Sequence, residues 1–244
     1  MKKRTVIVTG ASSGIGKAVA KYFLEKGDNV VINSATESKL LNAFNGLGAG
    51  PNLAMFAGDV RYKSTGDSLA VMAVDKFGSI DVLVNNAGIF GTRPFLEVDE
   101  KYLDQFLNTN LKGTLFTTQA VIPQMLDQKG GVVINISTAQ VNQGFGGRPV
   151  SAAIVSKAAI HALTIQLAAE FGRRNIRVNT IAAGVIRTHP QDDDRDKNAR
   201  LHLLNRIGEP EEIAQMVFAI AGNTFISGAI INVDGGMGAG FNLE

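Results

Sequence analysis

The chain has 244 residues, of which 45% are hydrophobic and 19% charged, so it can bury a large core and is not expected to be disordered. It contains no cysteine, which excludes disulfides, thiolate metal sites and cysteine nucleophiles. Twenty-four basic and 22 acidic side chains leave a net charge of +2, too weak to recruit nucleic acid or an anionic membrane. With neither a secretory leader nor an apolar run of membrane-spanning length, we expect a soluble globular protein, and the absence of cysteine fits a cytoplasmic location.

Short segments rich in β-branched residues alternate with stretches long enough for helices. Seven of these segments predict strands: Arg4–Thr9, Asn29–Asn33, Leu53–Ala57, Asp81–Asn85, Gly131–Ile136, Ile176–Ile181 and Ala229–Val233. Most are apolar throughout, as is typical of parallel strands covered on both faces. The alternation predicts one α/β domain over residues 1–244, a doubly wound Rossmann-type fold with about seven parallel strands and helices on both faces.

Three longer segments interrupt this alternation. We expect Asp99–Gln128 to form a long helix, Ser137–Arg148 a loop after the fifth strand, and Thr188–Gly208 a substrate loop after the sixth. Ligands of such sheets bind beyond the carboxyl ends of the strands. Two of these segments begin there, so we expect them to form walls of a substrate pocket.

The first predicted strand runs into a glycine-rich turn, and a helix from about Ile15 to Lys26 follows. Glycines let the backbone approach a pyrophosphate, while a helix N-terminus offers free N–H groups and the positive end of its dipole. The spacing is G-x-x-x-G-x-G rather than the usual G-x-G-x-x-G, but its place between first strand and first helix predicts a dinucleotide site. The residues expected to bind are Gly10, Ser12, Ser13, Gly14, Ile15 and Gly16.

The end of the second strand bears on the choice between NAD and NADP. A carboxylate there would bind the ribose 2′-hydroxyl and repel a 2′-phosphate. The chain instead has Ser34 and Thr36, whose hydroxyls can donate hydrogen bonds to a phosphate, and no acid before Glu37. We therefore expect NADP rather than NAD as the cofactor.

Further motifs follow in order along nearly the whole chain: Asn85-Asn86-Ala87-Gly88, Asn110 in Asn108–Gly113, and Gly228–Gly236. With the glycine turn, they resemble those of the short-chain dehydrogenase/reductase family. The resemblance implies a homotetramer or homodimer. It also implies that the adenine lies beside Asp59 and Val60, and its ribose beside Asn86, Ala87 and Gly88. The nicotinamide is expected beside Gly184, Ile186 and Thr188.

The catalytic region departs from the family pattern. The family has a serine after the fifth strand, then a tyrosine and a lysine four residues apart on one helix face. The lysine lowers the pKa of the phenol, which protonates the carbonyl oxygen as hydride arrives. Here Lys157 supplies the lysine, but Ala153 stands at the tyrosine position and Thr138 or Ser137 at the serine position. The resemblance thus implies that Lys157, a hydroxyl of Thr138 or Ser137, and a water held by Asn110 form the reaction site.

The missing phenol leaves several interpretations open. The proton donor could be a water held by Lys157 and Asn110, or one of the side chains Ser151, Arg148, His161 and His189. Alternatively, the chain binds nucleotide without turnover, or Ala153 is an engineered substitution, or the fold supports a dehydratase or epimerase reaction. Our leading hypothesis is an NADP(H)-dependent oxidoreductase that interconverts a carbonyl and a secondary alcohol.

Two other features have plainer interpretations. His189 and His202 bracket an acidic run, Asp192–Asp196, which we interpret as solvated or as part of a lid, and we expect no metal. The segment Ser151–Phe171 predicts a helix that is apolar on most sides and therefore buried. Together with apolar positions of Asp99–Gln128, it is expected to build a subunit interface.

Overall fold

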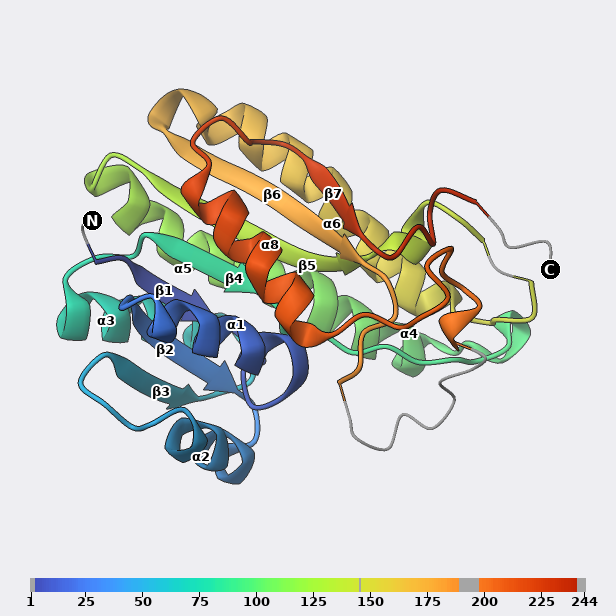
Figure 1. Ribbon diagram of the computed structural model, residues 1–244, viewed down its shortest axis with the longest axis horizontal. Coiled ribbons are helices and arrows are strands. Elements are labelled where there is room, and N and C mark those ends of the chain that lie inside the picture. The colour runs from blue at the N-terminus through green and yellow to red at the C-terminus, as the bar shows by residue number, and fades with distance from the viewer. Residues whose placement is uncertain (1–2, 145, 189–197, 241–244) are drawn as a thin grey trace.

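The computed structural model describes residues 3–144, 146–188 and 198–240, in which seven parallel strands form one sheet. The strands lie in the order β3-β2-β1-β4-β5-β6-β7, so the chain reverses direction across the sheet between β1 and β4 (Figure 1). Their bounds are Thr5–Val8, Asn29–Ser34, Leu53–Ala57, Val82–Asn85, Gly131–Thr138, Ile176–Ala183 and Ile230–Val233. All seven predicted strands and the doubly wound class are confirmed, and β5 runs on through Ser137 and Thr138, which we had expected in a loop.

Helices cover both faces of the sheet (Figure 1). The α-helices α1 to α6 and α8 span Gly14–Glu25, Glu37–Gly46, Lys63–Phe77, Glu100–Phe106, Gly113–Asp127, Ser151–Phe171 and Pro210–Gly222. Three 3-10 turns, η1, η3 and η4, span Phe95–Glu97, Ala139–Val141 and Gly172–Arg174.

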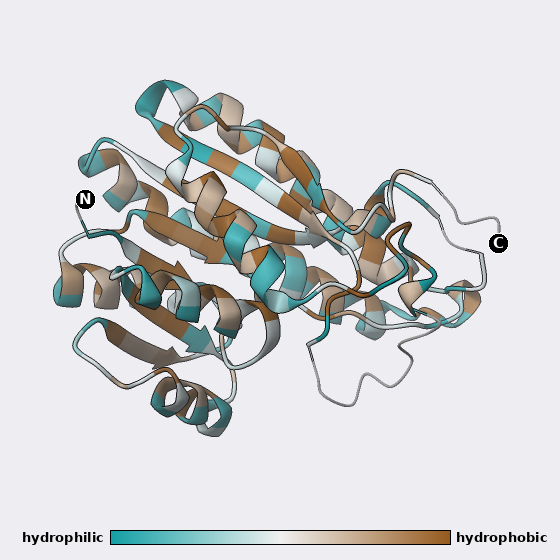
Figure 2. Cartoon of the chain, viewed as in Figure 1, coloured by the Kyte–Doolittle hydropathy of each residue, from teal (hydrophilic) through white to brown (hydrophobic). Residues whose placement is uncertain are grey.

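Two apolar cores lie on opposite sides of the sheet, because successive strand residues point to opposite faces. Val6 and Val8 of β1 pack toward α1 and α8, whereas Ile7 packs toward α3 and α5. All three side chains are fully buried. Figure 2 shows the apolar residues concentrated on the strands and hydrophilic ones on the outer faces of the helices.

The long helix predicted over Asp99–Gln128 is present but not uniform. Asp99 begins α4 by accepting a hydrogen bond from the Tyr102 amide through Oδ1 (2.7 Å). Between α4 and α5 lies a π-helical turn, η2 (Leu107–Lys112), and this wider turn contains Asn110. Single π-turns inside helices are frequent at functional sites.

Helix α6 has the predicted bounds, but only part of it is buried. One face packs on β5 and β6, whereas Val155 and Ile165 on another face are 56% and 58% exposed. The single chain thus buries only part of α6, and the predicted subunit interface, which would cover the rest, stays a prediction. By length and composition alone, residues 151–174 could cross a membrane, and the packing of α6 on the sheet offers another reason for that composition.

Candidate functional site

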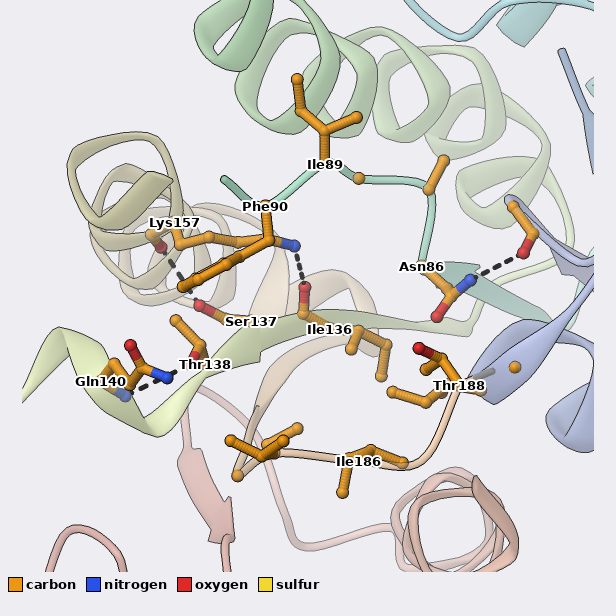
Figure 3. A pocket seen from close by; sticks show the side chains of 18 of the residues that line it. Asn86, Ile89, Phe90, Ile136, Ser137, Thr138, Gln140, Lys157, Ile186 and Thr188 are labelled. Carbon is orange, nitrogen blue, oxygen red and sulfur yellow. Dashed lines mark hydrogen bonds between the residues drawn. The ribbon is translucent and has the colours of Figure 1, made fainter. Parts of the chain in front are cut away.

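Beyond the carboxyl ends of the central strands lies a cavity of about 630 Å³ (Figure 3). Its walls come from the segments that follow β1, β4 and β6, from the end of β5 and from α6, as expected for an open α/β sheet. The predicted residues that line it are Gly10, Ser12, Ser13, Gly14, Ile15, Asn86, Ala87, Gly88, Ser137, Thr138, Lys157, Gly184, Ile186 and Thr188.

A second cavity of about 390 Å³ adjoins the first and shares Gly10, Ala87 and Gly88 with it. The predicted residues Ser34, Asp59 and Val60 line this cavity. The two cavities together contain most of the residues expected to hold the two ends of a dinucleotide.

The glycine turn is held against the segment after β4 by hydrogen bonds. Asn86 Nδ2 donates to the carbonyl oxygens of Thr9 and Gly10 (both 3.0 Å), and Thr9 Oγ1 accepts from the amides of Asn86 (3.1 Å) and Ala87 (3.0 Å). A Cβ on Gly16 would lie 2.5 Å from Asn86 Nδ2, so this position has no room for a side chain. The side-chain amide of Asn86 thus positions the turn.

The N-terminus of α1 is open toward the first cavity. Ser13 occupies the N-cap position but makes no capping hydrogen bond, and the first turn carries no acidic residue. The free N–H groups and the helix dipole therefore favour an anionic group there. Gly10 (φ +64°) and Gly14 (φ +52°) adopt left-handed conformations, and a Cβ on Gly10 would lie 2.8 Å from Ala87 Cα. These features fit a pyrophosphate-binding turn.

Lys157 lies at the base of the first cavity and is 9% exposed. Its Nζ donates to the Ile136 carbonyl oxygen (2.8 Å) and would lie 3.0 Å from a Cβ on Gly88 (Figure 3). Burial lowers the pKa of Lys157 to about 8, because desolvation disfavours the charged form. The ammonium is therefore still the main form at neutral pH.

The two hydroxyls at the end of β5 have different surroundings. Ser137 Oγ donates to the Lys157 carbonyl oxygen (3.3 Å) and lies 2.9 Å from His161 Nε2. Thr138 Oγ1 only accepts, from the Gln140 amide (3.3 Å), so its proton has no acceptor among the described residues. Burial, and then the neighbouring Lys157, lower the pKa of His161, which favours a neutral ring packed against Ser137.

Ala153 does not line either cavity. It is fully buried in an apolar cluster with Ala152 and Phe106, and Tyr102 packs against that cluster. The fold thus brings Tyr102 near the position of the missing phenol despite its distance in sequence. Among the described residues that line the two cavities, none is a tyrosine.

Asn110 is completely buried behind the first cavity. Its Nδ2 donates to the Ile89 carbonyl oxygen (3.0 Å) and to Ser156 Oγ (2.9 Å), and its Oδ1 accepts from the Ile89 amide (2.8 Å). Both amide protons are used, so the side chain fixes the segment after β4 to α6. The predicted water at Asn110 stays a prediction. Sequence reasoning missed Ser156, since no motif marks it.

Gly16, Thr36, Asn110 and Ala153 are the predicted site residues that line neither cavity. Thr36 is exposed and starts α2, so of the two hydroxyls expected near a 2′-phosphate only Ser34 lies in the cavity. The structure adds Arg61, which lines the same cavity and donates from Nε to Asp59 Oδ2 (2.8 Å). Its signal in the sequence was its place two residues after Asp59, which the predicted site already contained.

The predicted substrate loop is described only in part. His189 and the acidic run Asp192–Asp196 lie outside the described residues, as does Phe145 of the segment after β5. Within the described part, both ring nitrogens of His202 have partners: Nε2 accepts from the Val185 amide (3.0 Å), and Nδ1 lies 3.0 Å from the Asn198 carbonyl oxygen.

Comparison with known proteins gives the family. The family profile described as short chain dehydrogenase matches residues 4–199. The chain belongs to the short-chain dehydrogenase/reductase family. A similar relative is (2S)-((R)-hydroxy(phenyl)methyl)succinyl-CoA dehydrogenase subunit BbsD of Thauera aromatica, 35% identical over 97% of both chains. Another is 3-oxoacyl-(acyl-carrier-protein) reductase FabG of Thermotoga maritima, 34% identical over 97% of this chain and 98% of its own.

A solved structure supports the same assignment for this short-chain dehydrogenase. A crystal structure from Sinorhizobium meliloti 1021, assigned to the short-chain alcohol dehydrogenases, superposes with a TM-score of 0.88, at 31% identity over 97% of both chains. The protein is thus related to oxidoreductases that act on CH–OH or C=O groups with NAD(P).

Proposed function

We propose that this protein is an NADP(H)-dependent oxidoreductase that interconverts a carbonyl and a secondary alcohol of a small molecule. One observation carries the proposal: Lys157 and Thr138 line the same cavity as the glycine turn. A reacting carbonyl and a dinucleotide can therefore share one cavity with a buried cation and a free hydroxyl.

The residues present fit a dinucleotide, because Gly10 and Gly14 line the cavity in left-handed conformations and the N-terminus of α1, which also lines it, has no side-chain cap. The pyrophosphate would bind the turn from Gly10 to Gly16, and Asp59 with Val60 would flank the adenine. Ser34 and Arg61 face the position expected for a 2′-phosphate, which favours NADP. When bound, the nicotinamide supplies or accepts the hydride.

The chain's own residues would act on the substrate oxygen. Thr138 Oγ1 has a free proton and would donate a hydrogen bond to the carbonyl oxygen. The Lys157 ammonium would stabilise the negative charge that develops there, and in a dry site this effect is large. With Ala153 outside the cavity, the proton that completes the alcohol would come from Lys157 Nζ, whose pKa of about 8 suits a general acid.

The test is NADPH oxidation by the purified protein against a panel of aldehydes, ketones and oxo acids, with NADH in parallel. Turnover with at least one carbonyl and a preference for NADPH are expected. Tight NADPH binding without turnover of any carbonyl would contradict the proposal.

A second function, nucleotide binding without turnover, is favoured by the packing of Ala153. The site of the missing phenol is filled by the apolar cluster around Phe106. A parent protein that is inactive, together with an active Ala153→Tyr variant, would support this second function. An active parent would exclude it.

We also infer a cytoplasmic homo-oligomer, a tetramer or a dimer. The exposed apolar side chains Val155 and Ile165 on α6 give such an assembly a surface to bury. Light scattering after size-exclusion chromatography tests the oligomeric state, and a monomer at all concentrations would contradict this inference.

A further inference from the structure

We propose that the substrate is an oxo acid or hydroxy acid whose carboxylate binds Arg148 and Gln140 at the N-terminus of α6. This inference rests on the proposed function, because it names the substrate class of the same site. It follows from the charge of the cavity walls, from one unpaired buried side chain and from an uncapped helix.

Among the described residues, the walls of the substrate end carry positive charge only. Among the described residues that line the first cavity, Lys157 and Arg148 are charged and none is acidic. A further cavity of about 420 Å³ shares Gln140 and Arg148 with the first, and Arg148 is its one charged residue within the described chain. An anionic substrate would therefore meet no repelling carboxylate from the described residues of these walls.

No acid within the described part of the chain pairs with Arg148. Its Nη2 donates to Asn198 Oδ1 (2.6 Å), a neutral amide oxygen, and no carboxylate among the described residues pairs with the guanidinium. Guanidinium groups bind carboxylates through two parallel hydrogen bonds, which a neutral amide oxygen cannot replace. Arg148 is thus suited to exchange Asn198 for a carboxylate.

Gln140 supplies the second, independent observation. The residue is only 6% exposed, it lines both cavities, and its Oε1 is buried without a hydrogen-bond partner. Buried polar atoms are nearly always paired, so the carboxamide of Gln140 calls for a partner that a ligand or an ordered water can supply. Its Nε2 is the accessible end of the carboxamide, makes no hydrogen bond among the described residues and can donate to a carboxylate. Gln140 lies beside Thr138 (Figure 3), a short distance from the expected position of the reacting carbonyl.

The N-terminus of α6 adds to the attraction. Val150 occupies the N-cap position without a side-chain hydrogen bond, and the first turn of this 21-residue helix carries no acid. Ser151 and Ile154, from that first turn, line the cavity that contains Arg148. The dipole and the free N–H groups favour an anion there. Apolar walls at Phe95, Val150 and Ile154 leave room for a small hydrocarbon group on the same acid.

The test compares each acid with its uncharged ester, so that the carboxylate is the one difference. Turnover is measured with 2-oxobutanoate and acetoacetate and with their methyl esters, on the full chain and on Arg148→Gln. We expect the KM for the acids to rise about 10- to 100-fold in the variant, while the KM for the esters changes less than about twofold.

Two further variants separate charge from packing. Gln140→Glu keeps the shape of the side chain but places a carboxylate beside Arg148, so the KM for the acids should rise more than the KM for the esters. Lys21→Gln removes an exposed cation on α1, paired with Glu25 outside these cavities, and should change neither KM.

The outcomes distinguish this inference from the proposed function. If esters and acids turn over alike and Arg148→Gln changes neither, the carboxylate site is wrong and the proposed function stands. If no carbonyl turns over, the proposed function fails. The site is then decided by saturation-transfer NMR with 2-oxobutanoate. A signal lost in Arg148→Gln at unchanged melting temperature supports it, and an equal signal in both proteins overturns it.

Discussion

The turn after β1 and the β5–α6 region line the same cavity, but they are built in different ways. The turn relies on backbone: Gly10 and Gly14 hold left-handed conformations, and Asn86 fixes the loop from behind. The β5–α6 region relies on side chains, since Thr138 and Lys157 present a hydroxyl and an ammonium to the cavity.

We call the turn after β1 the binding half of the site and the β5–α6 region the reacting half. The difference between them shows which one can change its residues during evolution without loss of the fold. A side chain at Gly10 or Gly16 would collide with the segment after β4. Ala153, in contrast, is absorbed by its apolar neighbours around Phe106. We therefore expect the glycine positions that bind the dinucleotide to tolerate no side chain, whereas single residues of the reacting half can be replaced.

The largest expected effect comes from Lys157→Met. Without the ammonium, turnover should fall about 10³-fold, since both charge stabilisation and the proton are lost. The variant should nonetheless unfold at a higher temperature at pH 7, because a buried charge without a carboxylate partner is removed. Steady-state NADPH oxidation and thermal melts measure both, and Lys21→Met is the surface control. Full activity in Lys157→Met would show that Lys157 is not part of the reaction site.

Restoring the phenol is the next test of the reacting half. In Ala153→Tyr, the new ring has to leave the apolar cluster around Phe106 to reach the cavity, and as a general acid there it should raise turnover about 10²-fold, at the lower end of such contributions. Ala153→Phe is the matched control, since it adds the ring without the hydroxyl. Equal rates in the two variants would mean that the new ring stays among the apolar neighbours of Phe106 and does not reach the substrate.

Gly10→Ala tests the binding half. A Cβ 2.8 Å from Ala87 Cα, together with φ of +64°, should displace the turn and weaken NADPH binding about 10- to 100-fold. Gly27→Ala is the control, because Gly27 also has positive φ (+86°) but nothing within 4 Å of its Cβ position. Calorimetric titration should show the loss only for Gly10→Ala. Similar losses in both variants would point to a general loss of stability.

The pH dependence should follow Lys157. Its pKa of about 8 means that the ammonium is present below this pH, so kcat/KM for reduction should fall as pH rises through about 8. Stability should change in the opposite direction. The unfolded lysine, with a pKa of 10.5, binds more protons between about 8 and 10.5, so the free energy of unfolding rises with pH in that window. Lys157→Met should abolish this rise, and its persistence would assign it to another group.

The smallest expected effect concerns cofactor choice. Ser34→Asp places a carboxylate where a 2′-phosphate is expected, so the preference for NADPH over NADH should fall about tenfold. Arg61→Gln should lower the affinity for NADPH more than that for NADH. If neither variant changes the ratio of kcat/KM with NADPH to kcat/KM with NADH, Ser34 and Arg61 do not bind the 2′-phosphate.

The strands and most of the binding half were predictable, because short stretches of consecutive residues determine both. β-Branched runs mark the seven strands, and the spacing of Gly10, Gly14 and Gly16 marks the turn. The absence of the phenol was equally visible, since Lys157 fixes the position four residues before it.

Contacts between distant segments were not predictable. Ser137 meets His161 24 residues away, and Asn110 meets Ser156 46 residues away, through angles that only the packed fold sets. Which residues of α6 stay exposed was not predictable either, because the sequence of an apolar helix does not show which side its own chain covers. Gln140 carries no sequence signal, since what singles it out is an unpaired buried oxygen.

Transfer of deuterium tests the central claim most directly. The protein is incubated with a substrate found active and NADPH carrying deuterium at the reactive C4 position, and the alcohol is analysed by mass spectrometry. We predict one deuterium on the new carbinol carbon of each product molecule, and no transfer with Lys157→Met on the same timescale. The experiment is run with NADPH labelled on one face of C4 and, separately, on the other face. An alcohol that carries no deuterium with either label would contradict hydride transfer between a nicotinamide and a carbonyl at this site.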